Sequence, residues 1–196
     1  MKNYILLFLI ILLCANISAQ PKEKKGFIGI LIIPSFPVAN FADNSLENKN
    51  AGFAKKSYTN YFIDFGYRFG KNLGLSATYF TNDYKIDSSA ADLSWGFGGI
   101  TAGPMWSAHV ADKFFLDLRV NFGYTSADIF IKDNLPKEYS GHGLGIDTRV
   151  SLRYNLFRHW CVLAEAGYLS SNQKFGDGRK EKIQIINLGL GFAFRL

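Results

Sequence analysis

Apolar residues alternate with small or polar ones through most of this chain of 196 residues. From residue 114 onward, large apolar side chains fall at every second position, at Phe114, Leu116, Leu118, Val120, Phe122 and Tyr124. The positions between them hold Phe115, Asp117, Arg119, Asn121 and Gly123. Because successive side chains of a β-strand point in opposite directions, a period of two puts the two sets on opposite faces of a strand. The chain is therefore predicted to be all-β.

The same alternation recurs along the chain and predicts eight strands. We expect them at Gly26–Val38, Tyr58–Phe69, Leu73–Tyr84, Leu93–His109, Lys113–Ala127, His142–Leu156, Trp160–Ser171 and Ile183–Leu196. Short connections at 70–72, 110–112 and 157–159 alternate with longer polar connections at 39–57, 85–92, 128–141 and 172–182. This spacing predicts an up-and-down antiparallel sheet with every long loop at the same end.

Two of the expected strands contain residues that disturb a regular sheet. Pro34 and Pro37 interrupt the first, because proline has no N–H to donate to a neighbouring strand. In the fourth, the alternation shifts phase around Gly98 and Gly99, and paired glycines are typical of a β-bulge. Local distortion is expected at both places.

The first residues have the pattern of a secretory signal peptide. Lys2 precedes an apolar run at 5–15, and the small residue Ala19 suits a signal peptidase. The run is shorter than the ~20 residues that a membrane-spanning helix needs. We therefore expect a signal peptide at 1–19, a short N-terminal tail at 20–25 and a single β-domain at 26–196. Removal of Cys14 would leave Cys161 without a disulfide partner.

Two arguments place the apolar face on the outside of a closed barrel. The lumen of an eight-stranded barrel is only wide enough for side chains to fill it, so about forty large apolar residues could not fit inside. In addition, the charged residues of the expected strands avoid the middle of the apolar face. A Lys or Arg that faces lipid at mid-membrane costs about 2–4 kcal/mol, so this avoidance indicates contact with lipid. The predicted fold is an eight-stranded antiparallel up-and-down transmembrane β-barrel.

Aromatic residues cluster near both ends of the expected strands, as they do at membrane interfaces. The set near the short turns comprises Tyr67, Phe69, Trp106, Phe114, Tyr154 and Trp160. The set nearer the long loops comprises Tyr58, Tyr61, Tyr79, Trp95, Tyr124 and Tyr168. We interpret the two sets as aromatic girdles.

With its signal peptide, strand count, loop asymmetry and C-terminal "GFAFRL", the chain resembles the small eight-stranded outer-membrane β-barrels of Gram-negative bacteria, the OmpA/OmpX-like type. The resemblance covers Gly26–Leu196. It implies an outer-membrane location, with both termini and the short turns in the periplasm and the long loops outside the cell. It also implies a monomer in contact with outer-membrane lipid and lipopolysaccharide. In that family the barrel-assembly machinery reads the terminal strand, here Phe192, Phe194 and Leu196; the family ends on an aromatic residue, whereas this chain ends on leucine.

Charges of both signs are expected inside the barrel. The acids are Asp64, Asp117, Asp147 and Glu165, and the bases are Arg68, Arg119, Arg149, Arg153 and Arg195. Nearly balanced signs in a narrow interior favour paired networks, because the guanidinium fork of Arg accepts carboxylates in bidentate fashion. We expect these residues to plug the lumen. The alternative is a narrow ion or small-solute pore along the same residues.

The long loops are the predicted location of any specificity, since function often lies on loops held by a rigid scaffold. The basic residues Lys55, Lys56, Arg179, Lys180 and Lys182 are candidates for contact with lipid phosphates or an extracellular ligand. The simpler interpretation is a solvated polar loop. We therefore expect a structural or surface-interaction role.

An enzyme is the third interpretation, because some small barrels modify lipid A. The deacylase type resembles a His-x-Ser pair on one strand, but Leu144 stands at that spacing after His142. Ser126, Asp128 and His142 are expected near the loops, with a spacing that is not diagnostic of a palmitoyltransferase site. We expect no catalytic residues, no metal ligands and no cofactor. Nucleic-acid binding is not expected either, because the strand arginines interleave with acids.

Overall fold

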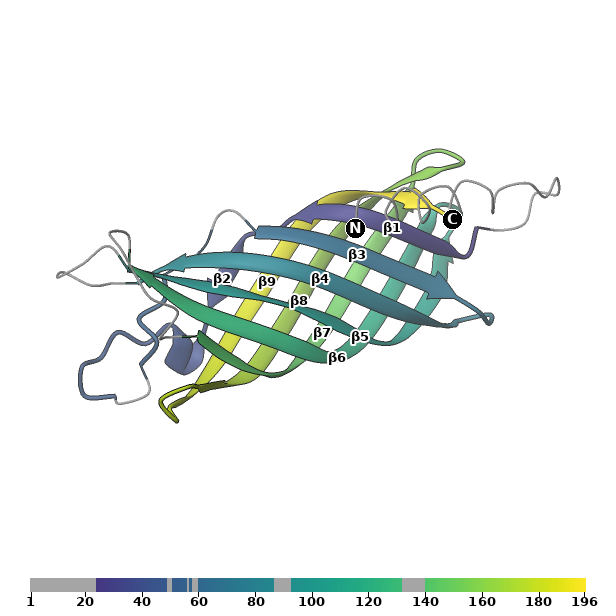
Figure 1. The fold of residues 1–196 in the computed structure, drawn as a ribbon. Coiled ribbons are helices and arrows are strands. Elements are labelled where there is room, and N and C mark those ends of the chain that lie inside the picture. Colours follow the sequence, from purple (N-terminus) through teal and green to yellow (C-terminus); the bar gives the residue numbers. More distant parts are fainter. Residues whose placement is uncertain (1–23, 49–50, 56, 58–59, 87–92, 132–139) are drawn as a thin grey trace, which may run out of the picture.

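The computed structural model describes residues 24–48, 51–55, 57, 60–86, 93–131 and 140–196. Its antiparallel strands are β1 (Gly26–Ile32), β2 (Ser35–Pro37), β3 (Asn60–Arg68), β4 (Leu73–Lys85), β5 (Leu93–Ala111), β6 (Phe114–Ile131), β7 (Ser140–Asn155), β8 (Trp160–Phe175) and β9 (Lys180–Arg195), and a short 3-10 helix, η1, spans Ala39–Phe41. From β3 to β9, neighbours in the sequence are neighbours in the sheet, β1 pairs with β3, and pairing of β1 and β2 with β9 closes the barrel (Figure 1). The predicted signal peptide lies outside the described residues.

The first two strands are one strand with a break. β1 pairs with β9 up to Ile32 and Leu190, and β2 continues the same register with Ser35 opposite Asn187. Between them, the backbone N–H of Leu188 donates to the carbonyl of Pro34 over 3.2 Å. The distortion that the prolines predicted is therefore confirmed, and the ring contains eight strands.

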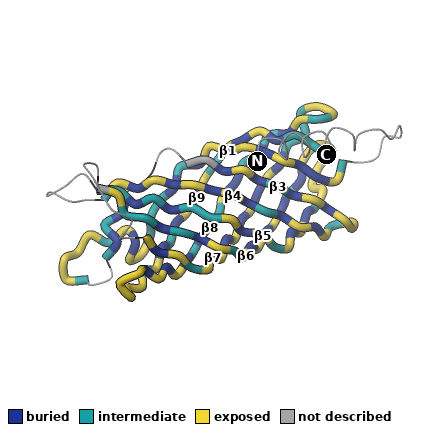
Figure 2. The backbone as a smooth tube through the Cα atoms, in the orientation of Figure 1, coloured by how far each residue is buried: buried dark blue, intermediate teal, exposed yellow. Residues whose placement is uncertain are grey.

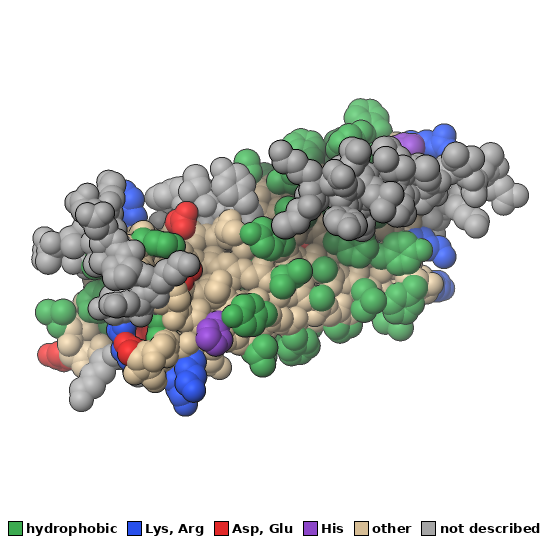
Figure 3. Space-filling view, viewed as in Figure 1, with side chains coloured by type: hydrophobic (Ala, Val, Ile, Leu, Met, Phe, Trp, Pro, Cys, Tyr) green, Lys and Arg blue, Asp and Glu red, His purple; other side chains and the backbone are tan. Residues whose placement is uncertain are grey.

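Buried and exposed residues alternate along the strands of the wall (Figure 2). The exposed large side chains belong to the apolar set, among them Ile30, Phe122, Ile146 and Leu190. Figure 3 shows these hydrophobic side chains along the wall and charged side chains at its two ends. The prediction that the apolar face points outward is confirmed. Among the described residues, no helix is long and apolar enough to cross a membrane.

The local distortion predicted at Gly98 and Gly99 is wrong. β5 pairs with β4 in one register throughout, and the irregularity in its pairing with β6 falls between His109 and Ala111. Because the strand keeps one register there without a bulge, Trp95 points into the barrel and is buried. Trp95 is therefore not part of an outer aromatic girdle.

The strands reach further at the loop end than the sequence pattern predicted. β6 continues to Ile131, β8 continues to Phe175 and β9 already begins at Lys180. The long connection expected at 172–182 is therefore wrong, and residues 176–179 alone join β8 to β9. As a consequence, Lys180 and Lys182 are strand residues.

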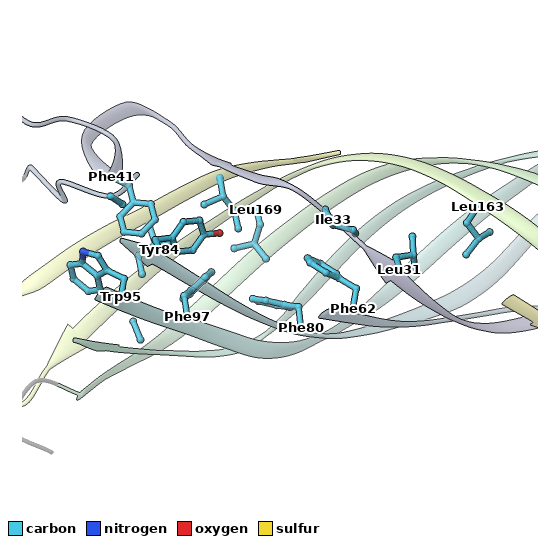
Figure 4. Packing of buried hydrophobic residues seen from close by; sticks show 14 of the residues in the cluster. Leu31, Ile33, Phe41, Phe62, Phe80, Tyr84, Trp95, Phe97, Leu163 and Leu169 are labelled. Carbon is cyan, nitrogen blue, oxygen red and sulfur yellow. The ribbon is translucent and has the colours of Figure 1, made fainter. Parts of the chain in front are cut away.

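The inside of the barrel differs along its axis. We use "turn end" for the end with the short turns and the described termini, and "loop end" for the opposite one. In the half nearer the loop end, inward-facing apolar side chains pack together (Figure 4): Phe62, Phe80, Tyr84, Phe97, Leu169, Ile183 and Ile185. We call these residues the apolar layer. The expectation that inward positions hold small and charged residues is wrong for these positions, although the same half also buries the polar side chains of Asn82, Thr125, Ser171 and Gln173.

Candidate functional site

A chain of ion pairs crosses the lumen on the turn-end side of the apolar layer. Arg119 of β6 donates from its two terminal nitrogens to Asp64 of β3 and to Glu165 of β8, each over 2.5 Å. Arg149 of β7 donates to the other oxygen of Glu165 over 3.2 Å and to Asp147 over 2.6 Å. We call these five residues the central charge network. They come from four strands and meet because each faces inward.

Hydroxyl groups add hydrogen bonds to the carboxylates of Asp64 and Glu165. Thr78 donates to Asp64 over 3.0 Å, and Ser151 donates to Glu165 over 2.7 Å. Arg119 also donates to the Ser151 hydroxyl. The side chains of the network are at most 2% exposed. Groups so deeply buried remain charged only when paired and hydrogen-bonded, so the pairs depend on one another.

A second ion pair lies nearer the turn end. Arg153 contacts Asp117 in a bidentate manner, with Nε to Oδ2 at 3.1 Å and Nη2 to Oδ1 at 3.2 Å. The Arg153 guanidinium also lies 4.6 Å from the centroid of the Phe115 ring and 5.0 Å from that of Phe27. Aromatic faces favour a guanidinium at this distance, so the rings pack the space around the pair.

Two of the arginines predicted for the lumen network lie outside these pairs. Arg68 stacks on the Phe115 ring and donates to the carbonyl of Lys71 in the β3–β4 turn. Arg195 lies at the end of β9 and donates to the carbonyl of Phe157 over 3.3 Å. Arg195 therefore lies at the rim, and its part in the lumen network stays a prediction.

The loop end of the lumen is covered by residues 39–48 and 51–54, which we call the loop-1 cap. Phe41 of η1 is buried and lies edge-on to the rings of Tyr84 and Trp95, with centroids 5.3 and 5.7 Å away. The indole N–H of Trp95 donates to the carbonyl of Gly52 over 2.9 Å. Phe53 holds the left-handed backbone conformation, with φ of 52°. The pattern of the strands did not reveal this cap, whose signal was the apolar Phe41 within a polar connection.

The other residues singled out in the sequence lie as follows. On the outer face are Tyr67, Phe69, Tyr79, Trp106, Phe114, Tyr124, Trp160 and Tyr168, with Tyr154 half-buried. Tyr58 and Lys56 lie outside the described residues, and the side chain of Tyr61 is not described. Lys55, Arg179, Lys180 and Lys182 are exposed, and Arg179 pairs with Asp177 over 2.6 Å. Cys161 is buried, Phe192 points outward, and Phe194 and Leu196 are half-buried.

The candidate enzyme residues Ser126, Asp128 and His142 lie at the loop end of β6 and β7. Ser126 and His142 are opposite each other in the β6–β7 pairing. The His142 ring stacks on Tyr124 at the outer surface, 6.1 Å between centroids. Within the described residues, no group of three or more His, Cys, Asp or Glu is arranged to hold a metal ion.

Comparisons with known proteins agree with this architecture. The family model described as "Outer membrane protein beta-barrel domain" matches residues 6–194. Neisserial surface protein A superposes with a TM-score of 0.61 at 12% identity, covering 87% of this chain and 97% of that one. OprG of Pseudomonas aeruginosa gives 0.53 at 14% identity, with 89% and 97% covered. Ail, the attachment invasion locus protein of Yersinia pestis, gives 0.51 at 15% identity, with 88% and 97% covered. The comparison with curated proteins gives no match.

Proposed function

The chain belongs to the outer-membrane β-barrel domain family, and we propose that it is a non-conducting member whose lumen is plugged and whose loops carry any interaction. In this proposal residues 1–19 are a cleaved signal peptide, and the turn end with both termini faces the periplasm. The barrel is a monomer assembled by the barrel-assembly machinery through Phe192, Phe194 and Leu196. It performs no catalysis.

The central charge network is the main observation that supports a plugged lumen. A path for ions through an eight-stranded barrel would have to pass Arg119 and Arg149, because the lumen of such a barrel is filled by side chains. Each of these arginines contacts two carboxylates at 2.5–3.2 Å. An ion that enters would have to displace a buried partner, which costs about 3–5 kcal/mol when it leaves a charge uncompensated.

Further side chains support a closed lumen on both sides of the network. Toward the loop end stand the apolar layer and then the loop-1 cap, where Phe41 is 2% exposed. Toward the turn end stands the Arg153–Asp117 pair between the Phe27 and Phe115 rings. An apolar layer opposes an ion by desolvation, because a charge taken out of water without a partner loses several kcal/mol.

The exposed cations near the loop end support a role in contact with anions at the cell surface. Lys55, Lys180 and Lys182 are exposed, and the phosphates of lipopolysaccharide are the anions nearest to residues at this level of the proposed orientation. Ail, which shares the fold, has been crystallised with the heparin analogue sucrose octasulfate. We propose that Lys55, Lys56, Arg179, Lys180 and Lys182 contact lipid phosphates or a sulfated or phosphorylated extracellular ligand.

Solute efflux from liposomes tests the plug. The mature chain is refolded into vesicles loaded with a small fluorescent anion or cation, and release is compared with that from protein-free vesicles. The proposal predicts that each dye leaves the protein-containing vesicles at the same rate as it leaves protein-free vesicles. Faster release of either dye would contradict it and favour the narrow pore.

A further inference from the structure

The turn end of the barrel carries a marked excess of positive charge. The basic residues described there are Lys24, Lys25, Lys71, Lys113, Arg158 and Arg195, and the acidic residue is Asp112. At the loop end both signs are present, with Asp43, Asp83, Asp128, Asp177 and Glu181 beside Lys55, Lys85, Lys174, Lys180 and Lys182. Figure 3 shows Lys and Arg side chains at the end with the termini and both signs at the other. The asymmetry indicates that the turn end faces anions.

Lys24, His159 and Arg195 meet at one place of the turn end, and Arg158 precedes His159 in the β7–β8 turn; we call these four residues the rim cluster. The amino group of Lys24 donates to the carbonyl of Arg195 over 2.8 Å and lies 3.4 Å from Nδ1 of His159. The backbone N–H of Arg195 in turn donates to the carbonyl of His159 over 2.8 Å. These contacts bring Lys24, the β7–β8 turn and the end of β9 together.

The like charges of the rim cluster act on one another. Burial, followed by the charges of Arg195 and Arg158, lowers the pKa of Lys24. Burial, together with the charges of Lys24, Arg158 and Arg195, also lowers the pKa of His159. A bound anion would relieve this repulsion, because it favours the protonated form of each base.

Exposed aromatic side chains flank the rim cluster. Phe157 and Trp160 bracket Arg158 and His159 in the β7–β8 turn and are 70% and 50% exposed. Trp160 meets the Phe194 ring edge-on, with centroids 5.6 Å apart. Aromatic rings beside basic groups are typical of the membrane–water interface, so the cluster lies at the level of lipid headgroups.

An apolar groove of about 580 Å³ lies on the outer wall and is lined in part by β8 and β9, the strands that also lead to the cluster. Its lining includes Val150, Leu152, Ala164, Ala166, Leu188 and Leu190. Trp160 pairs with Phe194 at the rim, and four residues further along the same two strands Ala164 pairs with Leu190. At about 3.3 Å per residue, the groove begins about 13 Å along the strand from the rim. Because barrel strands tilt by about 35–45°, this is about 10 Å along the barrel axis, at the depth of acyl chains. The two small alanines create the hollow.

We propose that the rim cluster and this groove together form a binding site for an anionic glycerophospholipid of the leaflet at the turn end. The phosphate contacts Lys24 and Arg158, and an acyl chain lies over Ala164 and Ala166. The inference rests on the proposed placement of the turn end at a phospholipid leaflet.

Native mass spectrometry of the full mature chain tests this site. The protein is refolded in vesicles of equal parts phosphatidylglycerol and phosphatidylcholine and released in mild detergent, and the ratio of the two retained lipids is measured. Wild type is expected to retain phosphatidylglycerol preferentially. The double variant Lys24→Gln/Arg158→Gln should lose this preference by roughly fivefold for each cation removed.

Two further variants separate the site from general electrostatics. Lys71→Gln/Lys113→Gln removes the same charge from the other turns and should leave the preference unchanged. Ala164→Leu/Ala166→Leu fills the groove without a change of charge and should reduce retention of both lipids. The proposal would be overturned if the turn control lost the preference for phosphatidylglycerol as strongly as the rim variant, or if wild type showed no such preference. It would also be overturned if soluble glycerophosphate bound as well as phosphatidylglycerol. Liposome efflux reports on the plug independently, so failure of one proposal is distinguishable from failure of the other.

Discussion

Arg119 and Glu165, which are 46 residues apart in the sequence, form an ion pair of 2.5 Å in the middle of the barrel. Arg119 is fully buried there, and its other terminal nitrogen contacts Asp64. One guanidinium therefore joins β6 to β3 and β8 across the lumen. Backbone hydrogen bonds join only adjacent strands of the barrel, whereas this side chain connects strands that are not adjacent.

Replacement of Arg119 by methionine should destabilise the barrel by about 3–5 kcal/mol, because Asp64 and Glu165 would remain buried with reduced compensation. Urea unfolding of the chain in detergent micelles or vesicles measures the change. The matched control is Arg179→Met, whose pair with Asp177 is 49% and 43% exposed. Exposed pairs contribute about 0–1 kcal/mol, so an equal loss in the two variants would contradict the account.

The Arg153–Asp117 pair should show strong coupling in a double-mutant cycle. Arg153→Met or Asp117→Leu alone leaves one buried charge and should cost about 3–5 kcal/mol. The double variant should be much closer to wild type, since a buried pair replaced by apolar residues is often neutral. Additive losses in the same unfolding measurement would count against a tight pair.

The loop-1 cap should open when Phe41 is truncated. Phe41→Ala removes the buried ring between Tyr84 and Trp95, and loss of a buried Phe side chain costs about 3–5 kcal/mol. Limited trypsin digestion of the refolded barrel should then cleave after Lys55 much faster. Leu46→Ala, a change in the same connection at a side chain 92% exposed, should leave the rate unchanged. Unchanged cleavage in Phe41→Ala would mean that the cap is held by other contacts.

Gly123 should resist even a methyl group. A Cβ at Gly123 would overlap the backbone oxygen of Ile100 on the neighbouring strand, so Gly123→Ala forces the strands apart. Overpacking of this kind typically costs about 1–3 kcal/mol. The control is Gly176→Ala in the β8–β9 connection, where a Cβ has no atom within 4 Å. The gel mobility of heated and unheated samples across a urea series compares the two.

The alternation of the sequence was sufficient for the strand order, the outward apolar face and the inward charges. It could predict these because side chains of a strand repeat with a period of two residues. In a membrane-spanning strand, charged side chains are tolerated only on the face that points away from lipid. It failed at Trp95, since two adjacent glycines look like a bulge when the neighbouring strand is unknown. Pairing with β4 keeps the register there.

The apolar layer and the cap depend on contacts that no local pattern contains. Three different strands carry an inward-facing phenylalanine, at Phe62, Phe80 and Phe97. In the sequence, each of them is indistinguishable from the aromatic residues that are common in β-strands. Their rings lie 5.5–5.7 Å apart only once the barrel has closed. Likewise, the partners of Arg119 were not predictable one by one, because the register of β3 and β8 relative to β6 decides which carboxylates it reaches.

Single-channel recording in a planar bilayer tests the closed lumen most directly. The refolded mature chain is expected to insert as a heat-modifiable barrel and to produce no reproducible conductance steps. Reproducible steps that change in Arg149→Ala or Asp147→Ala would contradict the plug and make the central charge network the lining of a pore.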